Sequence, residues 1–87
     1  MSTITFEEML AVLKHEATYP NLEERLADAK PTSELENDLR IDSLDREEMR
    51  ICLEDAFKID IPCDRLSDCV TATDLLNLIN RQKGVFA

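Results

Sequence analysis

Residues 37–49 read "NDLRIDSLDREEM" and contain the clearest structural signal in the chain. In this stretch Ser43 follows Asp42 at the point where an irregular segment gives way to a helical pattern. Asp and Ser are both preferred N-cap residues, and an acidic residue in the first turn, here Asp45, complements the helix dipole. The pattern therefore predicts a helix over residues 43–58 that is capped by Asp42 or Ser43.

The predicted helix over residues 43–58 has two different faces. At about 100° per residue, one arc gathers the residues expected in the core, which are Met49, Cys52, Leu53, Ala56 and Phe57. Leu44 and Ile51 fall nearly opposite, about two turns apart. The charged residues around them are Glu47, Glu48, Glu54, Asp55 and Lys58. Single exposed apolar residues are ordinary, but two aligned ones in an acidic field favour a surface that a basic partner recognises.

Further helices are predicted on both sides of this one. Thr5 and Glu8 form a capping-box pattern, and the apolar residues Phe6, Met9, Leu10 and Leu13 follow at helical spacing. This first helix should end before Tyr19–Pro20, because a residue that precedes proline avoids the α region. A last helix should begin near residues 71–73, carry Leu75, Leu76, Leu78 and Ile79, and end near Gly84. A brief helical turn is expected over residues 64–68.

The connection over residues 16–42 is long for so small a domain. Its segment "NLEERLADA" predicts a short helix, with Asn21 and Glu24 as a cap and Leu22 and Leu26 facing inward. Leu35 and Leu39 are expected to anchor the rest of the connection to the core. The sum is a single all-α domain over residues 1–87, a small bundle of three longer helices plus one short helical turn.

Composition narrows the function. Nineteen acidic against ten basic residues give a net charge of −9, which disfavours nucleic acids and anionic membranes because phosphate binding rests on Lys and Arg. No apolar run has the length of a membrane span, and the N-terminus lacks a signal-peptide pattern. We therefore expect a cytoplasmic protein, without membrane insertion, that acts as a monomer. The spacings of Cys52, Cys63 and Cys69 match neither a disulfide framework nor a zinc site, so small apolar roles are expected and no metal.

Ser43 has no sequence partner that would activate it. A nucleophilic serine needs a base such as histidine, and the only histidine, His15, belongs to the first predicted helix. The chain has no G-x-S-x-G elbow, no calcium-loop spacing, and no Gly-rich phosphate loop, since Gly84 is its only glycine. A hydrolase is therefore disfavoured. Ser43 is either a structural residue of a helix start or a modification site, where free backbone amides suit a phosphate group.

The segments "SELENDLRIDSLDREEM", "LEDAFKIDIP" and "TATDLLNLI" resemble, in this order, the acyl carrier protein family. The resemblance covers about residues 33–79, and the D-L-x-x-D-S-L motif followed by F-x-I-x-I-P is fairly specific. It implies that Ser43 is the attachment point for 4′-phosphopantetheine, which a phosphopantetheinyl transferase moves from coenzyme A using magnesium. The terminal thiol would hold acyl groups as thioesters. The chain would then be a carrier, not an enzyme, for fatty-acid, polyketide or related biosynthetic enzymes with basic docking surfaces.

The resemblance also implies roles for neighbouring residues. Asp42 and Leu44 would help the transferase recognise the site. The partner-recognition set would be Asp42, Leu44, Glu47, Glu48, Ile51 and Asp55, which coincides with the exposed face found from spacing. Candidates to line an acyl cavity are Leu53, Phe57, Leu75 and Ile79, although ordinary core packing accounts for all four.

Three departures from the family pattern indicate a specialised carrier with its own partners. Arg40 stands where the family commonly has glycine, and Glu47 and Arg50 occupy commonly aliphatic positions. Arg50, at the edge of the core face, is expected to direct its charge outward. The third departure is the long connection. Two alternatives remain open: an acidic interaction module of the same fold without a prosthetic group, and an aminoacyl or peptidyl carrier, although those relatives usually read G-G-x-S where this chain has Asp42.

Overall fold

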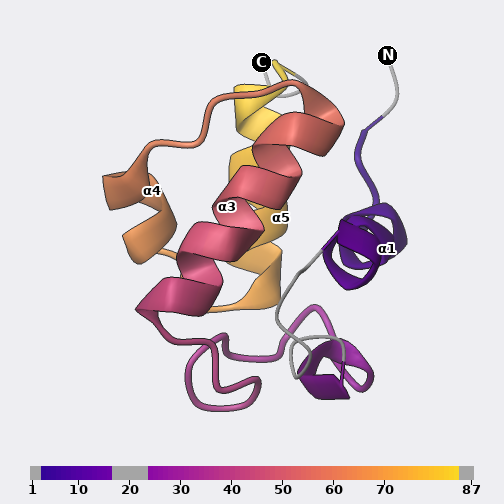
Figure 1. Cartoon of the computed structure of the whole chain (residues 1–87), viewed down its shortest axis with the longest axis vertical. Coiled ribbons are helices and arrows are strands. Elements are labelled where there is room, and N and C mark those ends of the chain that lie inside the picture. Colours follow the sequence, from indigo (N-terminus) through magenta and orange to yellow (C-terminus); the bar gives the residue numbers. More distant parts are fainter. Residues whose placement is uncertain (1–2, 17–23, 85–87) are drawn as a thin grey trace.

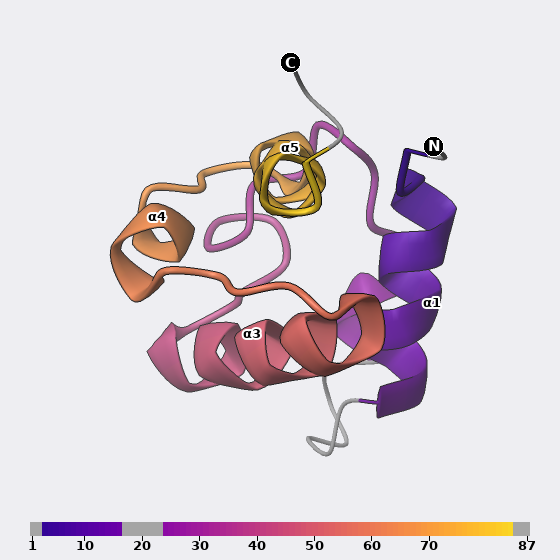
Figure 2. The same cartoon turned by 90° about the horizontal axis from the view of Figure 1, so that it is seen from above.

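The computed structural model describes residues 3–16 and 24–84. Its helices are α1 (Phe6–Glu16), α3 (Ser43–Phe57), α4 (Cys63–Ser67) and α5 (Ala72–Gln82). Figures 1 and 2 show α1 and α4 on opposite sides of the molecule, with α3 and α5 between them. The predicted all-α bundle is confirmed. The predicted end of the first helix at Tyr19–Pro20 and the cap at Asn21 with Leu22 lie outside the described residues.

The helix ends follow the local sequence patterns. At α1 the Glu8 carboxylate accepts from the Thr5 N–H at 3.0 Å, and the Thr5 hydroxyl accepts from the Glu8 N–H at 3.1 Å. Thr71 and Asp74 form the same reciprocal arrangement at α5. Gly84, with φ +79°, follows the end of α5 in the left-handed region that favours glycine. These capping predictions are confirmed because they depend only on residues three positions apart.

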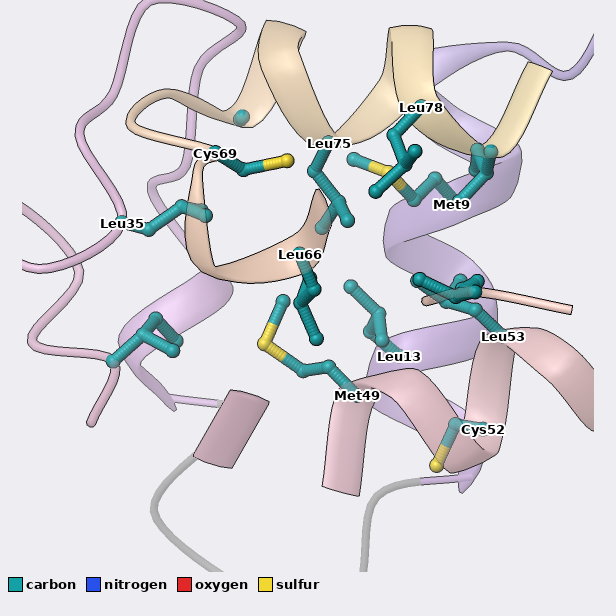
Figure 3. Packing of buried hydrophobic residues seen from close by; sticks show 14 of the residues in the cluster. Met9, Leu13, Leu35, Met49, Cys52, Leu53, Leu66, Cys69, Leu75 and Leu78 are labelled. Atoms are coloured by element: carbon teal, nitrogen blue, oxygen red, sulfur yellow. The ribbon is translucent and has the colours of Figure 1, made fainter. Parts of the chain in front are cut away.

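The core lies between the helices, where side chains from every element meet (Figure 3). Met9 and Leu13 of α1, Met49 and Leu53 of α3, and Leu75, Leu78 and Ile79 of α5 are among its buried residues. The prediction of Ala56 as a core residue is wrong, because this side chain is exposed. Helical spacing fixes the direction of a side chain but not whether another element covers it, and nothing among the described residues covers the last turn of α3 at Ala56.

The described part of the connection between α1 and α3, residues 24–42, has order of its own. Residues 24–26 form a single helical turn, and Leu26, Leu35 and Leu39 are buried, as the sequence predicts. Further along, the Leu35 N–H donates to the Val70 carbonyl at 2.8 Å, which holds the connection against the entry to α5. Residues 24–42 are therefore part of the folded domain.

Asn80 joins the two ends of the described chain. Its side chain is buried, accepts from the Ile4 N–H at 2.8 Å and donates to the Ile4 carbonyl at 3.0 Å. Nδ2 also donates to the Leu76 carbonyl at 3.2 Å within α5. This contact was not predicted from the sequence, because no local pattern connects positions so far apart.

The three cysteines are free. Cys52 and Cys69 are buried, as expected for small apolar residues, whereas Cys63 is exposed at the first residue of α4. Among the residues that the structure describes, no three His, Cys, Asp or Glu side chains are arranged so that they could hold a metal ion. Among the helices described, none has the length and apolar character needed to cross a bilayer.

Candidate functional site

Ser43 is the first residue of α3, and its side chain is exposed. The capping residue is Asp42, which resolves the alternative between Asp42 and Ser43. The Asp42 Oδ1 accepts from the Asp45 N–H at 2.8 Å, and the Asp45 Oδ2 accepts from the Asp42 N–H at 3.2 Å. The Ser43 hydroxyl is therefore left available, since the capping role belongs to its neighbour. The first helical amides, including those of Ser43 and Leu44, have no acceptor inside the helix.

Asp45 links the start of α3 to the long connection. It is buried, and its carboxylate receives two hydrogen bonds from Arg25, at 2.6 Å from Nη1 and 3.1 Å from Nη2. The hydrogen bonds from Arg25 lower the pKa of Asp45, and the same interaction raises the pKa of Arg25. The pair therefore remains charged at neutral pH, and the capping box is reinforced from outside the helix. Helical spacing places Asp45 in the first turn, but no local pattern identifies Arg25 as its partner.

Arg40 has an unusual backbone conformation two residues before Asp42. Its φ is +58°, in the left-handed region that is disfavoured for residues with a Cβ. The Arg40 carbonyl accepts a hydrogen bond of 2.7 Å from Arg25 Nη1. Glycine suits this position because it has no Cβ and adopts a positive φ readily. The arginine found here is held by the hydrogen bond from Arg25.

The face of α3 that carries Leu44 and Ile51 is exposed, as helical spacing predicts. Leu44 is 66% and Ile51 52% exposed, and Val70, which precedes α5, is 57% exposed. The exposure of Val70 was not predicted, because a lone apolar residue between Cys69 and Thr71 carries no periodic signal. Three large apolar side chains are thus exposed to solvent.

The charged residues on this face are partly paired with one another. Arg50 lies between Glu47, with which it forms an ion pair, and Glu54, at 3.0 Å. The hydrogen bond from Arg50 lowers the pKa of Glu47. The Arg50 side chain is 20% exposed, and its guanidinium group meets two carboxylates. The prediction that Arg50 directs its charge outward from the core is confirmed.

The other two predicted recognition carboxylates lie in different surroundings. Asp55 is exposed, and its nearest cation is Lys58 at 3.9 Å, also exposed. Such a pair contributes little to stability. Glu48 is half-buried, with Oε1 accepting from the Cys52 thiol at 3.8 Å. Asp55 is therefore the more accessible of the two to a basic partner.

The four acyl-cavity candidates are packed in the core. Leu53, Leu75 and Ile79 are fully buried, and Phe57 is half-buried against the core. Surface hollows lie elsewhere among the described residues. One, of about 260 Å³, lies between α4 and α5 and is lined by Arg65, Asp68, Cys69, Asp74, Asn77, Leu78 and Arg81. Another, of about 130 Å³, is lined by Glu34, Glu36, Asn37, Arg46, Ser67, Cys69 and Val70. Neither hollow includes any of the four candidates, so an acyl cavity there stays a prediction.

Among the curated proteins that resemble this chain over its larger part are two acyl carrier proteins. An acyl carrier protein of Prochlorococcus marinus (strain MIT 9515) is 39% identical over 57 residues, which is 66% of this chain and 71% of that protein. An acyl carrier protein of Thermobifida fusca (strain YX) is 36% identical over 55 residues, which is 63% of this chain and 70% of that protein. No protein-family model matches the chain.

Proposed function

Because this chain belongs to the acyl carrier protein family, whose members are carriers and not enzymes, we propose that Ser43 carries a 4′-phosphopantetheine arm. The arm would supply a terminal thiol on which acyl groups are held as thioesters. The acyl groups would be presented to fatty-acid, polyketide or related specialised biosynthetic enzymes. The observation that carries this proposal is the exposed hydroxyl of Ser43 at the start of α3, next to the exposed side chain of Leu44.

The surroundings of Ser43 suit a phosphodiester. Its hydroxyl is exposed while Asp42 performs the capping, so modification would not remove a hydrogen bond that holds the helix. The positive end of the α3 dipole and the free amides of the first turn favour an attached phosphate. The Asp42 carboxylate repels the attached phosphate electrostatically. The hydrogen bond that Asp42 accepts from the Asp45 N–H offsets part of this negative charge.

The attachment reaction is a phosphoryl transfer from coenzyme A. The Ser43 oxygen forms a bond to phosphorus, the phosphoanhydride bond to adenosine 3′,5′-bisphosphate breaks, and a base of the transferase takes the hydroxyl proton. Because the transferase supplies the base, Ser43 needs no base from its own chain. On the carrier side, the reaction requires only an accessible hydroxyl in a defined backbone position.

The exposed face of α3 is proposed as the docking surface for the transferase and for acyl-transferring enzymes. Leu44 and Ile51 offer apolar contacts, while the net charge of −9 steers a basic surface toward the chain. Asp42 and Asp55 add exposed carboxylates along the same helix, and Glu47 and Glu48 lie between them. Val70 extends the set of exposed apolar side chains.

Intact mass spectrometry tests this proposal. The chain is incubated with coenzyme A, magnesium and a phosphopantetheinyl transferase of broad specificity, and we expect the mass to rise by one phosphopantetheinyl group. Ser43→Ala should abolish the gain, whereas Ser67→Ala, which changes an exposed serine in α4, should retain it. An unchanged mass of the unsubstituted chain, or a gain that survives Ser43→Ala, would refute the proposal. If partner binding then proved indifferent to Ser43→Ala, the interaction module would be favoured.

A further inference from the structure

Arg25 connects the long segment between α1 and α3 to the backbone that carries Ser43. We propose that Arg25 is a positioning residue, which holds residues 40–45 in the conformation that the phosphopantetheinyl transferase recognises. This inference rests on the proposed function of Ser43 and adds to it a determinant outside the docking face. Arg25 lies eighteen residues before Ser43 in the sequence, so it would act through the backbone around the serine and not by touching the donor.

Arg25 contacts residues that lie before and after Ser43 in the sequence. Nη1 donates to the Arg40 carbonyl at 2.7 Å, three residues before the serine, and to Asp45 Oδ2 at 2.6 Å, two residues after it. Nη2 donates to Asp45 Oδ1 at 3.1 Å, which completes a bidentate pair. Planar bidentate pairs of this kind fix geometry as well as adding stability. One guanidinium group therefore sets the separation and orientation of the two ends of the 40–45 segment.

Arg25 is itself held in place. It belongs to the helical turn of residues 24–26, and Leu26 beside it is 1% exposed. Its own side chain is only 23% exposed, and that of Asp45 is 8% exposed. Solvent competes weakly for a pair covered to this extent, which separates it from the exposed pair of Asp55 and Lys58.

The backbone conformation at Arg40 explains why the hydrogen bonds from Arg25, here called the Arg25 brace, are needed. A residue with a Cβ is disfavoured at φ +58°, and Arg40 is one of two non-glycine residues with a positive φ in the described chain. Without the hydrogen bond to its carbonyl, Arg40 would gain by moving to a negative φ. That movement would displace Asp42 and Ser43, which follow directly.

Modification kinetics of a small set of variants test the role. Arg25→Ala removes the brace, and Arg81→Ala removes an exposed arginine at the far end of α5 as a charge-matched control. Arg40→Gly allows the positive φ without a brace, alone and in the Arg25→Ala background. Initial rates give kcat and KM for the carrier, and circular dichroism with a melting curve confirms that each variant is folded at the assay temperature.

We expect Arg25→Ala to lower kcat/KM by about tenfold, roughly the factor that corresponds to a lost charge-assisted hydrogen bond. Arg81→Ala should stay within about twofold of the unsubstituted chain. Arg40→Gly should restore most of kcat/KM in the Arg25→Ala background without restoring the melting temperature, because glycine relieves the backbone but does not replace the ion pair. A loss of stability alone would not give this separation.

The outcomes distinguish the two proposals. If the unsubstituted chain accepts no phosphopantetheinyl group, the proposed function fails. If it is modified and Arg25→Ala is modified equally well, or if Arg40→Gly leaves the defect unchanged, Arg25 is not the positioning residue. In that case the proposed function of Ser43 remains intact.

Discussion

Replacing Asn80 by alanine removes the side chain that fastens the N-terminal segment to α5. The variant would leave the N–H and the carbonyl of Ile4 without the partner that they have at 2.8 and 3.0 Å. Asn80 is 1% and Ile4 5% exposed, so water reaches these groups poorly. A buried polar group without a partner costs about 1–3 kcal/mol, and two of them give roughly 2–6 kcal/mol.

The lower part of that range is expected, because residues near a chain end can shift toward water and recover some hydrogen bonding. We therefore predict that Asn80→Ala lowers the free energy of unfolding by about 2–4 kcal/mol. For a domain of this size the melting temperature should fall by roughly 10–25 °C. Such a loss is a large fraction of the stability that a small domain possesses.

Asn77→Ala provides a matched control, since Asn77 is exposed on the same helix. Alanine is the better helix former by up to about 0.7 kcal/mol, so this variant should be unchanged or slightly more stable. Urea unfolding followed by circular dichroism measures both variants under one condition. If the two differ by less than about 0.5 kcal/mol, the bridge between Ile4 and Asn80 does not contribute as its geometry implies.

Three further predictions concern the site and the core. Leu44→Arg and Ile51→Arg should leave the melting temperature within about 2 °C, because both positions are exposed, yet lower kcat/KM for modification by about tenfold through the loss of complementarity. Asp45 has a pKa below its ordinary value of 3.8 because of Arg25. Its pairing therefore stabilises the fold above that ordinary value and is lost as the pH falls through the folded-state pKa. Unfolding between about pH 2 and pH 7 should show Asp45→Asn less stable at neutral pH, with a shallower loss below about pH 4. Leu53→Ala should cost about 2–5 kcal/mol in urea unfolding, because its side chain is fully buried.

The parts of the fold that depend on neighbouring residues could be predicted from the sequence. The capping box of Thr5 and Glu8, the start of α5 at Thr71 and the stop at Gly84 each involve residues within a few positions of one another. The exposed positions of Leu44 and Ile51 follow from helical periodicity alone. Periodicity fails at Ala56, because it gives a direction and not the presence of a covering element.

The parts that depend on distant contacts could not be predicted in this way. Asn80 meets Ile4 across 76 positions, and Asn77 on the same helix is just as polar in the sequence yet exposed. Asp45 looks like an ordinary first-turn acid, and only the approach of Arg25 makes it a buried, paired carboxylate. Whether a polar residue can be buried depends on the partner that it contacts in the folded chain. The local sequence pattern does not identify that partner.

Arg40 shows how two separate departures from a family pattern can depend on one another. In the sequence, an arginine at a position that is commonly glycine and an unusually long connection look unrelated. In the structure, the arginine has φ +58°, a conformation in which a Cβ is disfavoured. The connection supplies the Arg25 guanidinium that holds the carbonyl of that same residue. A glycine at position 40 would need no such donor. We therefore expect carriers with this long connection and its arginine to tolerate a bulky residue before the D-S-L motif, and carriers without them to retain glycine there.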